Sequence, residues 1–259
     1  MSERLIELTV RDRIATVAFD RPDRLNAVST PLLERLVDVF AEINDRADIW
    51  CVILKGNGRA FCVGADQKER PGMSPEEVRR RRRIGPRAFS SMRECVRPVI
   101  AQVHGYALGS GLEMAIGSDI VVAAEGTVFG MIETVLGAIP GGGATALLPR
   151  IIGLPRAREL IYTGRRFSAE DALRWGMISY VVPAAELEAK ALSLAREICA
   201  AAPIAVAQAK KAMNLFADTD LASGMRLEAE LYDRTIATKD RAEALRAYAE
   251  KRPPVFRGE

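Results

Sequence analysis

Two segments decide the expected fold of this chain, PVIAQVHGYALGSGLE at residues 98–113 and TVFGMIETVLGAIPG at residues 127–141. Each begins with an apolar, strand-like stretch, enters a turn containing glycine and presents one glutamate, Glu113 or Glu133. Carboxylates rarely lie in apolar surroundings unless they have a partner or a function. We therefore expect Glu113 and Glu133 to share one site.

The residues that follow the first glycine turn, 112–116, have the pattern of a helix start. The first N–H groups of a helix have no partner within it, so they should point toward the shared site. Two acids beside a set of backbone donors indicate acid–base chemistry next to a stabilised oxyanion.

The remaining elements are predicted from hydrophobic period and capping residues. Ser29 or Thr30 should cap a helix that has Pro31 in its first turn, and Ser74-Pro-Glu-Glu77 is a capping box that starts another, which Gly85-Pro86 should break or bend. Further strands are expected at 5–10, 14–19, 51–54 and 178–182, and further helices at 155–162 and 168–175.

Strand signals end at Pro183. Residues 184–250 are rich in Ala, Leu, Glu and Arg and predict three or four helices, with a break at Ala202-Pro203 and a loop near Asp218 to Gly224. The composition shift predicts two regions, a core at 1–183 that holds the site and a helical region at 184–259.

Composition limits the classes of partner. Among 259 residues, 37 Lys+Arg against 34 Asp+Glu leave a net charge of +3, which is too small to indicate a polyanion partner, so nucleic acid is not expected. The first residues, 1–4, do not resemble a secretory leader, and no apolar run has the length of a membrane span. The scattered Cys51, Cys62, Cys95 and Cys199 predict a reduced, cytoplasmic setting.

Two further features bear on the chemistry. His104 is the only histidine, which excludes a multi-histidine metal site, and we expect no metal. Arginine occupies every position from Arg79 to Arg83. A solvated helix face is the favoured interpretation of this run, and attraction of phosphate is the alternative.

Several motifs, in order along nearly the whole chain, resemble those of the crotonase, or enoyl-CoA hydratase/isomerase, family. They are RPDRLNAV (21–28), AFCVGADQK (60–68), HGYALGSGLE (104–113), FGMIE (129–133), GAIPGGG (137–143) and EKRPPVFRG (250–258). The resemblance implies an α/β fold, a crotonase-like spiral of ββα turns, with a helical C-terminal trimerisation region. It also implies homotrimers, often paired into hexamers.

The same resemblance implies an activity and site residues. The expected activity is that of an enoyl-CoA hydratase, a lyase of fatty acid metabolism that needs no cofactor because CoA is part of the substrate. The backbone N–H groups of Ala65 and Ser110 would form the oxyanion hole, Glu113 would activate water, Glu133 would deliver a proton and Gly141 would help to position the water. Contacts to CoA are expected from Arg24, Ala27, Asp66, Gln67 and Lys68.

Ser110 and Gln67 depart from the family's usual glycine and aliphatic residue, which bears on substrate choice. Other activities of the family, double-bond isomerisation and thioester hydrolysis, remain as alternatives. Isomerases commonly keep only the glutamate that matches Glu133, so two glutamates favour hydration. An RNA-binding or scaffolding role for the helix with Arg79–Arg83 is the alternative from another class.

Overall fold

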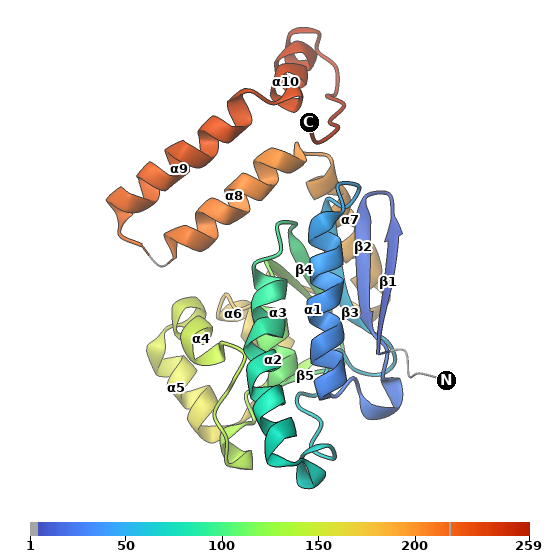
Figure 1. Cartoon of the computed structure of the whole chain (residues 1–259), viewed down its shortest axis with the longest axis vertical. Helices are drawn as coiled ribbons and strands as arrows, with labels where there is room; N and C mark the ends of the chain where they lie inside the picture. The colour runs from blue at the N-terminus through green and yellow to red at the C-terminus, as the bar shows by residue number, and fades with distance from the viewer. Residues whose placement is uncertain (1–4, 218) are drawn as a thin grey trace.

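A computed structural model describes residues 5–217 and 219–259 (Figure 1). Residues 1–4 and Asp218 lie outside the described part. The predictions that fall on them, for the start of the chain and for the first residue of the loop at 218–224, therefore lie outside it too. The described chain is a mixed α/β structure, as the sequence predicted.

Two sheets form the core of the fold. The larger has the order β1 (Ile6–Arg11), β2 (Ile14–Phe19), β3 (Cys51–Gly56), β4 (Val99–Val103), β6 (Ile120–Ala124) and β9 (Tyr180–Val182), and all its neighbours are parallel except β1 and β2. The smaller has the order β5 (Tyr106–Leu108), β7 (Val128–Gly130) and β8 (Arg166–Ser168).

The chain alternates between the sheets and then enters a helix, which is the predicted ββα spiral. One turn runs through β4 and β5 into α3 (Ser110–Ile116), and the next runs through β6 and β7 toward α4 (Ala144–Ile152). The other helices are α1 (Thr30–Asp45), α2 (Pro75–Arg93), α5 (Leu154–Thr163), α6 (Ala169–Arg174), α7 (Leu187–Cys199), α8 (Pro203–Phe216), α9 (Leu221–Ile236) and α10 (Lys239–Ala249). Short 3₁₀ turns lie at η1 (Pro22–Arg24), η2 (Arg70–Gly72), η3 (Thr134–Leu136) and η4 (Ala184–Glu186).

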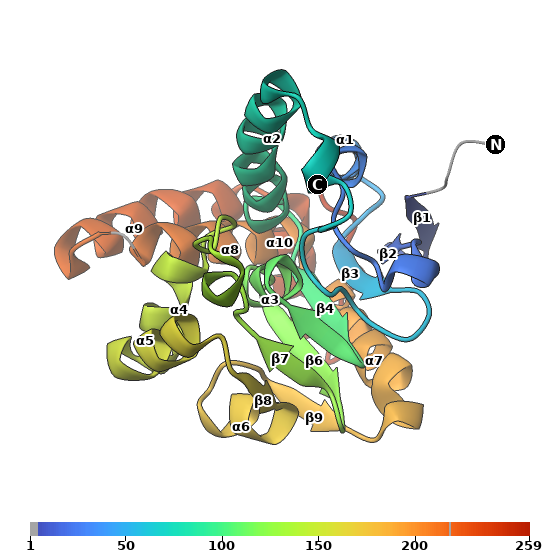
Figure 2. The ribbon, with the colours of Figure 1, turned by 90° about the horizontal axis from the view of Figure 1, so that it is seen from below.

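Successive side chains along a strand point to opposite faces of the larger sheet, so each face has its own apolar side chains. Val52 and Leu54 of β3 pack into the main core with α1, whereas Cys51 and Ile53 face a second cluster that contains Leu194 of α7. Figure 2 shows β3 and β4 between α3 and α7. The sheet therefore presents one face to the helices that carry the site and the other to α7.

Capping residues set the helix starts as the sequence predicted. The Ser29 hydroxyl accepts the Leu32 N–H at the start of α1, and Ser74 and Glu77 form the capping box of α2. Of the break or bend predicted at Gly85-Pro86, the break is wrong, because α2 continues to Arg93, and the bend stays a prediction. Burial of Phe89 and Met92 in the core keeps the second half of the helix in place despite the missing proline donor.

The helices beyond Pro183 form two groups that pack differently. Helix α7 covers the larger sheet, whereas α8, α9 and α10, the helical arm, extend away from it (Figure 1). Gly224 lies inside α9, not in the loop that the sequence predicted, since Asp220 caps a helix that begins at Leu221. The division at residue 183 stays a prediction.

Across residues 5–217 and 219–259, no single helix has the length and apolar composition of a membrane span. Residues 184–199 and 203–216 reach that composition only as a pair bent by 105°.

An ion pair between a buried lysine and a more exposed aspartate joins the arm to the spiral. Lys210 of α8 is 6% exposed, and its Nζ lies 2.7 Å from Asp119 Oδ2 and 3.0 Å from the Arg97 carbonyl oxygen. The same Asp119 oxygen accepts the Val99 N–H at the start of β4. The ammonium therefore ties α8 to the beginning of two neighbouring strands.

We expect Lys210→Met to lower the free energy of unfolding by about 1.5–3 kcal/mol, because the hydrogen bonds that the ammonium donates to Asp119 and to the Arg97 carbonyl are lost. The matched control is Lys239→Met, which breaks an exposed pair with Glu259 and should cost less than about 1 kcal/mol. Urea denaturation at one fixed protein concentration measures both. Equal costs for the two variants would contradict a fixing role for Lys210.

Candidate active site

One cavity of about 630 Å³ collects the two glutamates, and its wall is formed by α2, α3 and the segments 63–73 and 132–141. The predicted site residues on this wall are Ala65, Gln67, Ser110, Glu113, Glu133 and Gly141. They come from three separate stretches of sequence, and the spiral brings them together.

Glu113 lies on the first turn of α3 and is 2% exposed. Its Oε1 accepts the N–H groups of Gly142 at 2.7 Å and Ala144 at 3.1 Å. Burial raises the pKa of Glu113, and these backbone donors act in the opposite direction by stabilising the carboxylate. Neither donor was predicted from the sequence, although GGG at 141–143 directly before a helix was a signal for exposed N–H groups.

Glu133 follows β7 and directly precedes η3. Burial, with a smaller contribution from the negative charge of Glu113, raises the pKa of Glu133 to about 7. Its Oε2 is buried and has no hydrogen-bond partner among the described residues. Glu133 is therefore able to carry a proton near neutral pH, while Glu113 is held as an acceptor by backbone donors.

The backbone before Glu113 approaches Glu133 closely. Gly109 adopts φ 51° and ψ −121°, and a Cβ atom built on it would lie 2.6 Å from Glu133 Oε1. Only glycine satisfies both the positive φ and the contact. The turn thus places the Glu133 carboxylate beside the start of α3.

The two predicted oxyanion donors also come from adjacent segments. A Cβ atom built on Gly64 would lie 3.5 Å from the Ser110 amide nitrogen. Val28 pairs with the residues on either side of Ala65, since its N–H donates to the Gly64 carbonyl and its carbonyl accepts the Asp66 N–H. By strand alternation the Ala65 N–H points away from Val28, and the Ser110 N–H is at the open end of a helix.

The predicted CoA contacts are more dispersed. Gln67 lies on the cavity wall, Arg24 and Lys68 are exposed, and Ala27 is buried. Asp66 is 8% exposed and pairs with Arg21, with Asp66 Oδ2 3.1 Å from Arg21 Nη2. The Asp66 side chain therefore holds its own loop, and its predicted contact with CoA stays a prediction.

The arginine run on α2 is only partly a free basic face. Arg80 pairs with Glu34 and Arg81 pairs with Glu69, which leaves less positive charge for an external phosphate. Within residues 5–217 and 219–259, no group of three or more His, Cys, Asp or Glu side chains is arranged to hold a metal ion. That the reaction needs no metal or cofactor stays a prediction.

Comparison with known proteins identifies relatives along the full length. The family model described as enoyl-CoA hydratase/isomerase matches residues 9–259. The chain is 42% identical over 259 residues to Bacillus subtilis YngF, whose name assigns it only provisionally to enoyl-CoA hydratase/isomerase; all of both chains is covered. It is 36% identical to a short-chain-enoyl-CoA hydratase of Clostridium acetobutylicum, covering 93% of this chain and 92% of that protein.

Solved structures give the same result for the fold. The crystal structure of an enoyl-CoA hydratase from Bacillus anthracis superposes with a TM-score of 0.95 at 41% sequence identity, covering 98% of this chain and 100% of that one. A second structure, from Streptomyces coelicolor, superposes with a TM-score of 0.94 at 33% identity, covering 100% and 96% of the two chains. These superpositions confirm the predicted crotonase-like fold.

The raised pKa of Glu133 predicts how stability depends on pH. Between the ordinary pKa of 4.5 and about 7, the folded chain keeps the Glu133 proton that the unfolded chain has lost. The free energy of unfolding therefore decreases as pH rises through this window. Glu133→Gln removes the titration, so the wild-type free energy minus that of the variant should fall from pH 4.5 to 7 and be level above it.

Thermal unfolding of both proteins at matched pH values measures this difference. A difference that stays constant across the window, or that increases with pH, would show that the Glu133 carboxyl is not held in its neutral form.

Proposed function

This chain belongs to the enoyl-CoA hydratase/isomerase family, and from that premise we propose that it adds water across the double bond of a 2-enoyl-CoA thioester. The observation that carries the proposal is the pair of glutamates, buried Glu113 and half-buried Glu133, on the wall of one cavity with the segments of Ala65 and Ser110. CoA enters as part of the substrate, and the proposal includes no other cofactor.

The thioester oxygen is proposed to lie between the Ala65 and Ser110 N–H groups. An enoyl thioester accepts a nucleophile at its β carbon only if the negative charge that develops on this oxygen is stabilised. Backbone donors fixed in a largely apolar cavity provide that stabilisation without having to reorganise during the reaction.

The two glutamates are proposed to divide the acid–base work. Ionised Glu113 takes a proton from water as the water oxygen bonds to the β carbon, and protonated Glu133 gives its proton to the α carbon. The π electrons pass through an enolate held at the oxyanion donors, and the product is a 3-hydroxyacyl-CoA. The backbone donors on Glu113 and the raised pKa of Glu133 support this assignment.

Isomerisation is the nearest alternative within the family. It requires one carboxyl group that moves a proton between two carbons, and Glu133 alone could do this. The second buried carboxylate, Glu113, supports hydration instead, because it has a separate set of hydrogen-bond donors beside the same cavity. Thioester hydrolysis would release free CoA, which a thiol reagent detects.

The helical arm is proposed to form subunit contacts in a homotrimer, or in a hexamer of two trimers. Large apolar side chains are exposed on α8–α10, among them Met213 (67%), Leu221 (65%), Met225 (62%) and Ile236 (55%). A soluble chain rarely exposes so many large apolar groups on one segment unless another surface covers them.

A cytoplasmic location stays a prediction from the cysteine pattern.

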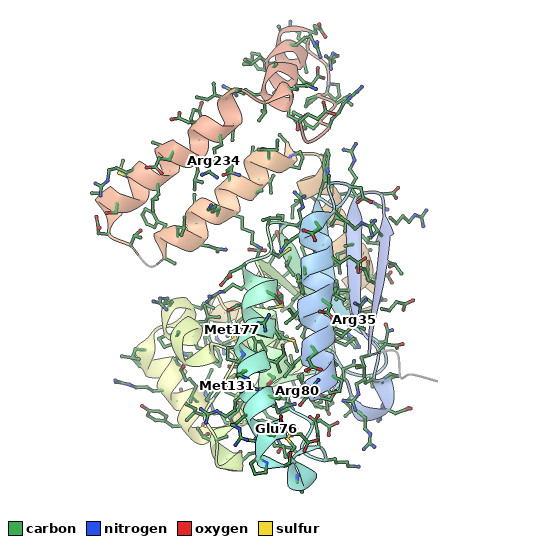
Figure 3. All side chains as sticks on the ribbon, in the orientation of Figure 1. Arg35, Glu76, Arg80, Met131, Met177 and Arg234 are labelled. Carbon is green, nitrogen blue, oxygen red and sulfur yellow. The ribbon has the colours of Figure 1, made fainter. Side chains whose placement is uncertain are left out.

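Glu113→Gln and Glu133→Gln should each lower kcat for hydration of crotonyl-CoA by about 10²–10⁴-fold, because each removes one proton-transfer group. Binding of an acyl-CoA should weaken far less. The control is Glu76→Gln. Glu76 is an exposed acid on α2 (Figure 3) that does not line the cavity, so this change should leave turnover unchanged.

In the wild type, kcat/KM should fall as pH rises above about 7, since Glu133 must carry a proton.

Loss of absorbance of the conjugated thioester measures turnover. Near wild-type kcat in either glutamine variant on an accepted substrate would exclude the two-glutamate mechanism.

For assembly, sedimentation velocity at micromolar concentration should give the mass of a trimer or hexamer. Met225→Glu combined with Ile236→Glu should shift the protein toward monomer, because charged groups would then be buried at the contact. A wild-type protein that sediments as a stable monomer would contradict the proposed assembly.

A further inference from the structure

The arginine run on α2 contains two neighbours with different surroundings. Arg80 is on the outer side, where its guanidinium binds both carboxylate oxygens of Glu34 on α1 at 2.6 and 2.7 Å, and its side chain is 60% exposed (Figure 3). The Arg81 side chain is only 13% exposed and points toward the cavity wall. The two residues therefore form a natural comparison between a surface bridge and an internal one.

The Arg81 guanidinium joins three segments. Its Nη1 donates to Glu69 Oε2 at 2.8 Å and to Thr30 Oγ1 at 3.2 Å, and its Nη2 donates to the Val28 carbonyl at 2.9 Å. The Glu69 carboxylate in turn accepts the Thr30 N–H, at 3.0 and 3.1 Å from its two oxygens. Helix α2, the start of α1 and the segment after Ala65 are thus closed into one network.

This network reaches Ala65 through Val28. The Val28 carbonyl accepts both Arg81 and the Asp66 N–H, and the Val28 N–H donates to the Gly64 carbonyl at 2.8 Å. Because the residues on both sides of Ala65 are bonded to Val28, the direction of the Ala65 N–H depends on where Val28 is held. Arg81 supplies the side-chain bond to that carbonyl.

A second, independent pair holds the same loop from elsewhere. Arg21 pairs with Asp66 and donates to the Ala27 carbonyl. Loss of Arg81 should therefore leave the loop folded while removing one of the two constraints on its position. The expected effect is a small displacement of the Ala65 N–H, not a collapse of the cavity.

We infer that Arg81 is a positioning residue that fixes the Ala65 N–H for the developing oxyanion, acting through Val28 and Glu69. The inference rests on the proposed function, in which Ala65 is an oxyanion donor. Hydrogen bonds to an oxyanion depend steeply on distance, and complete loss of one donor costs about 10²–10³-fold in kcat. A displaced donor should cost less, roughly 10–100-fold, with KM little changed because the interaction strengthens mainly in the transition state.

This role depends on the planar, forked shape of the guanidinium group. Its planar nitrogens reach a carbonyl, a hydroxyl and a carboxylate at once, whereas an ammonium is a single point of donation on a flexible stem. Arg81→Lys should therefore restore only part of the lost kcat.

The test compares Arg81→Ala with Arg80→Ala, which removes a bridge between the same two helices without touching the loop. Thermal unfolding confirms that both are folded, and Arg81→Lys replaces Arg81→Ala if the latter is not. The first readout is kcat and KM on crotonyl-CoA. The second is the absorption maximum of bound para-dimethylaminocinnamoyl-CoA, which shifts to the red when hydrogen bonds draw electron density toward its thioester oxygen.

Arg81→Ala should lower kcat roughly 10–100-fold, leave KM nearly unchanged and reduce the red shift. Millimolar guanidinium should recover part of the lost kcat and of the red shift. Arg80→Ala should match the wild type in every respect.

Equal red shifts in the two alanine variants would overturn the inference, whatever happens to kcat. Failure of the proposed function has a different signature, since a wild type that hydrates no enoyl-CoA can still bind the probe and shift its absorption. The inference would then be decided by the probe alone, and a wild type that causes no red shift would overturn it.

Discussion

The site depends on removing two carboxylates from water while providing backbone donors to only one of them, Glu113. Glu113 is 2% exposed and accepts the N–H groups of Gly142, in the loop before α4, and of Ala144, the first residue of α4. Glu133 has no such donors on its Oε2, so burial shifts its pKa toward neutrality. The difference between two chemically identical side chains thus arises from the backbone around them. The proposed assignment of Glu113 as base and Glu133 as acid rests on that difference.

Local signals predicted much of the fold. The Ser29 cap, the Ser74–Glu77 capping box and the Gly-flanked glutamates each depend on residues close in sequence, and each lies where it was expected. The predictions failed where tertiary packing overrides a local preference. Pro86 does not end α2, since Phe89 and Met92 are anchored in the core beyond it. The family resemblance, not periodicity, supplied the order of the spiral.

Long-range pairs could not be predicted from the sequence. Arg81 with Val28, Arg21 with Asp66 and Lys210 with Asp119 join residues far apart along the chain, and no spacing rule connects them. In the sequence Arg81 was one of five identical arginines, and only the fold distinguishes it from Arg80. The bonds of Arg81 and Arg21 hold the loop of Ala65. The Lys210–Asp119 pair instead joins α8 to the start of β4.

Mass spectrometry of the product formed in D₂O tests directly whether the chain adds water to an enoyl thioester. Crotonyl-CoA incubated with the protein should gain one molecule of solvent water, with the oxygen at the β carbon and one non-exchanging deuterium at the α carbon. With Glu113→Gln the same product should form about 10²–10⁴-fold more slowly under the same conditions. A shifted double bond with no gain of oxygen, or free CoA with an unsaturated acid, would contradict hydration and assign the two glutamates to a different reaction.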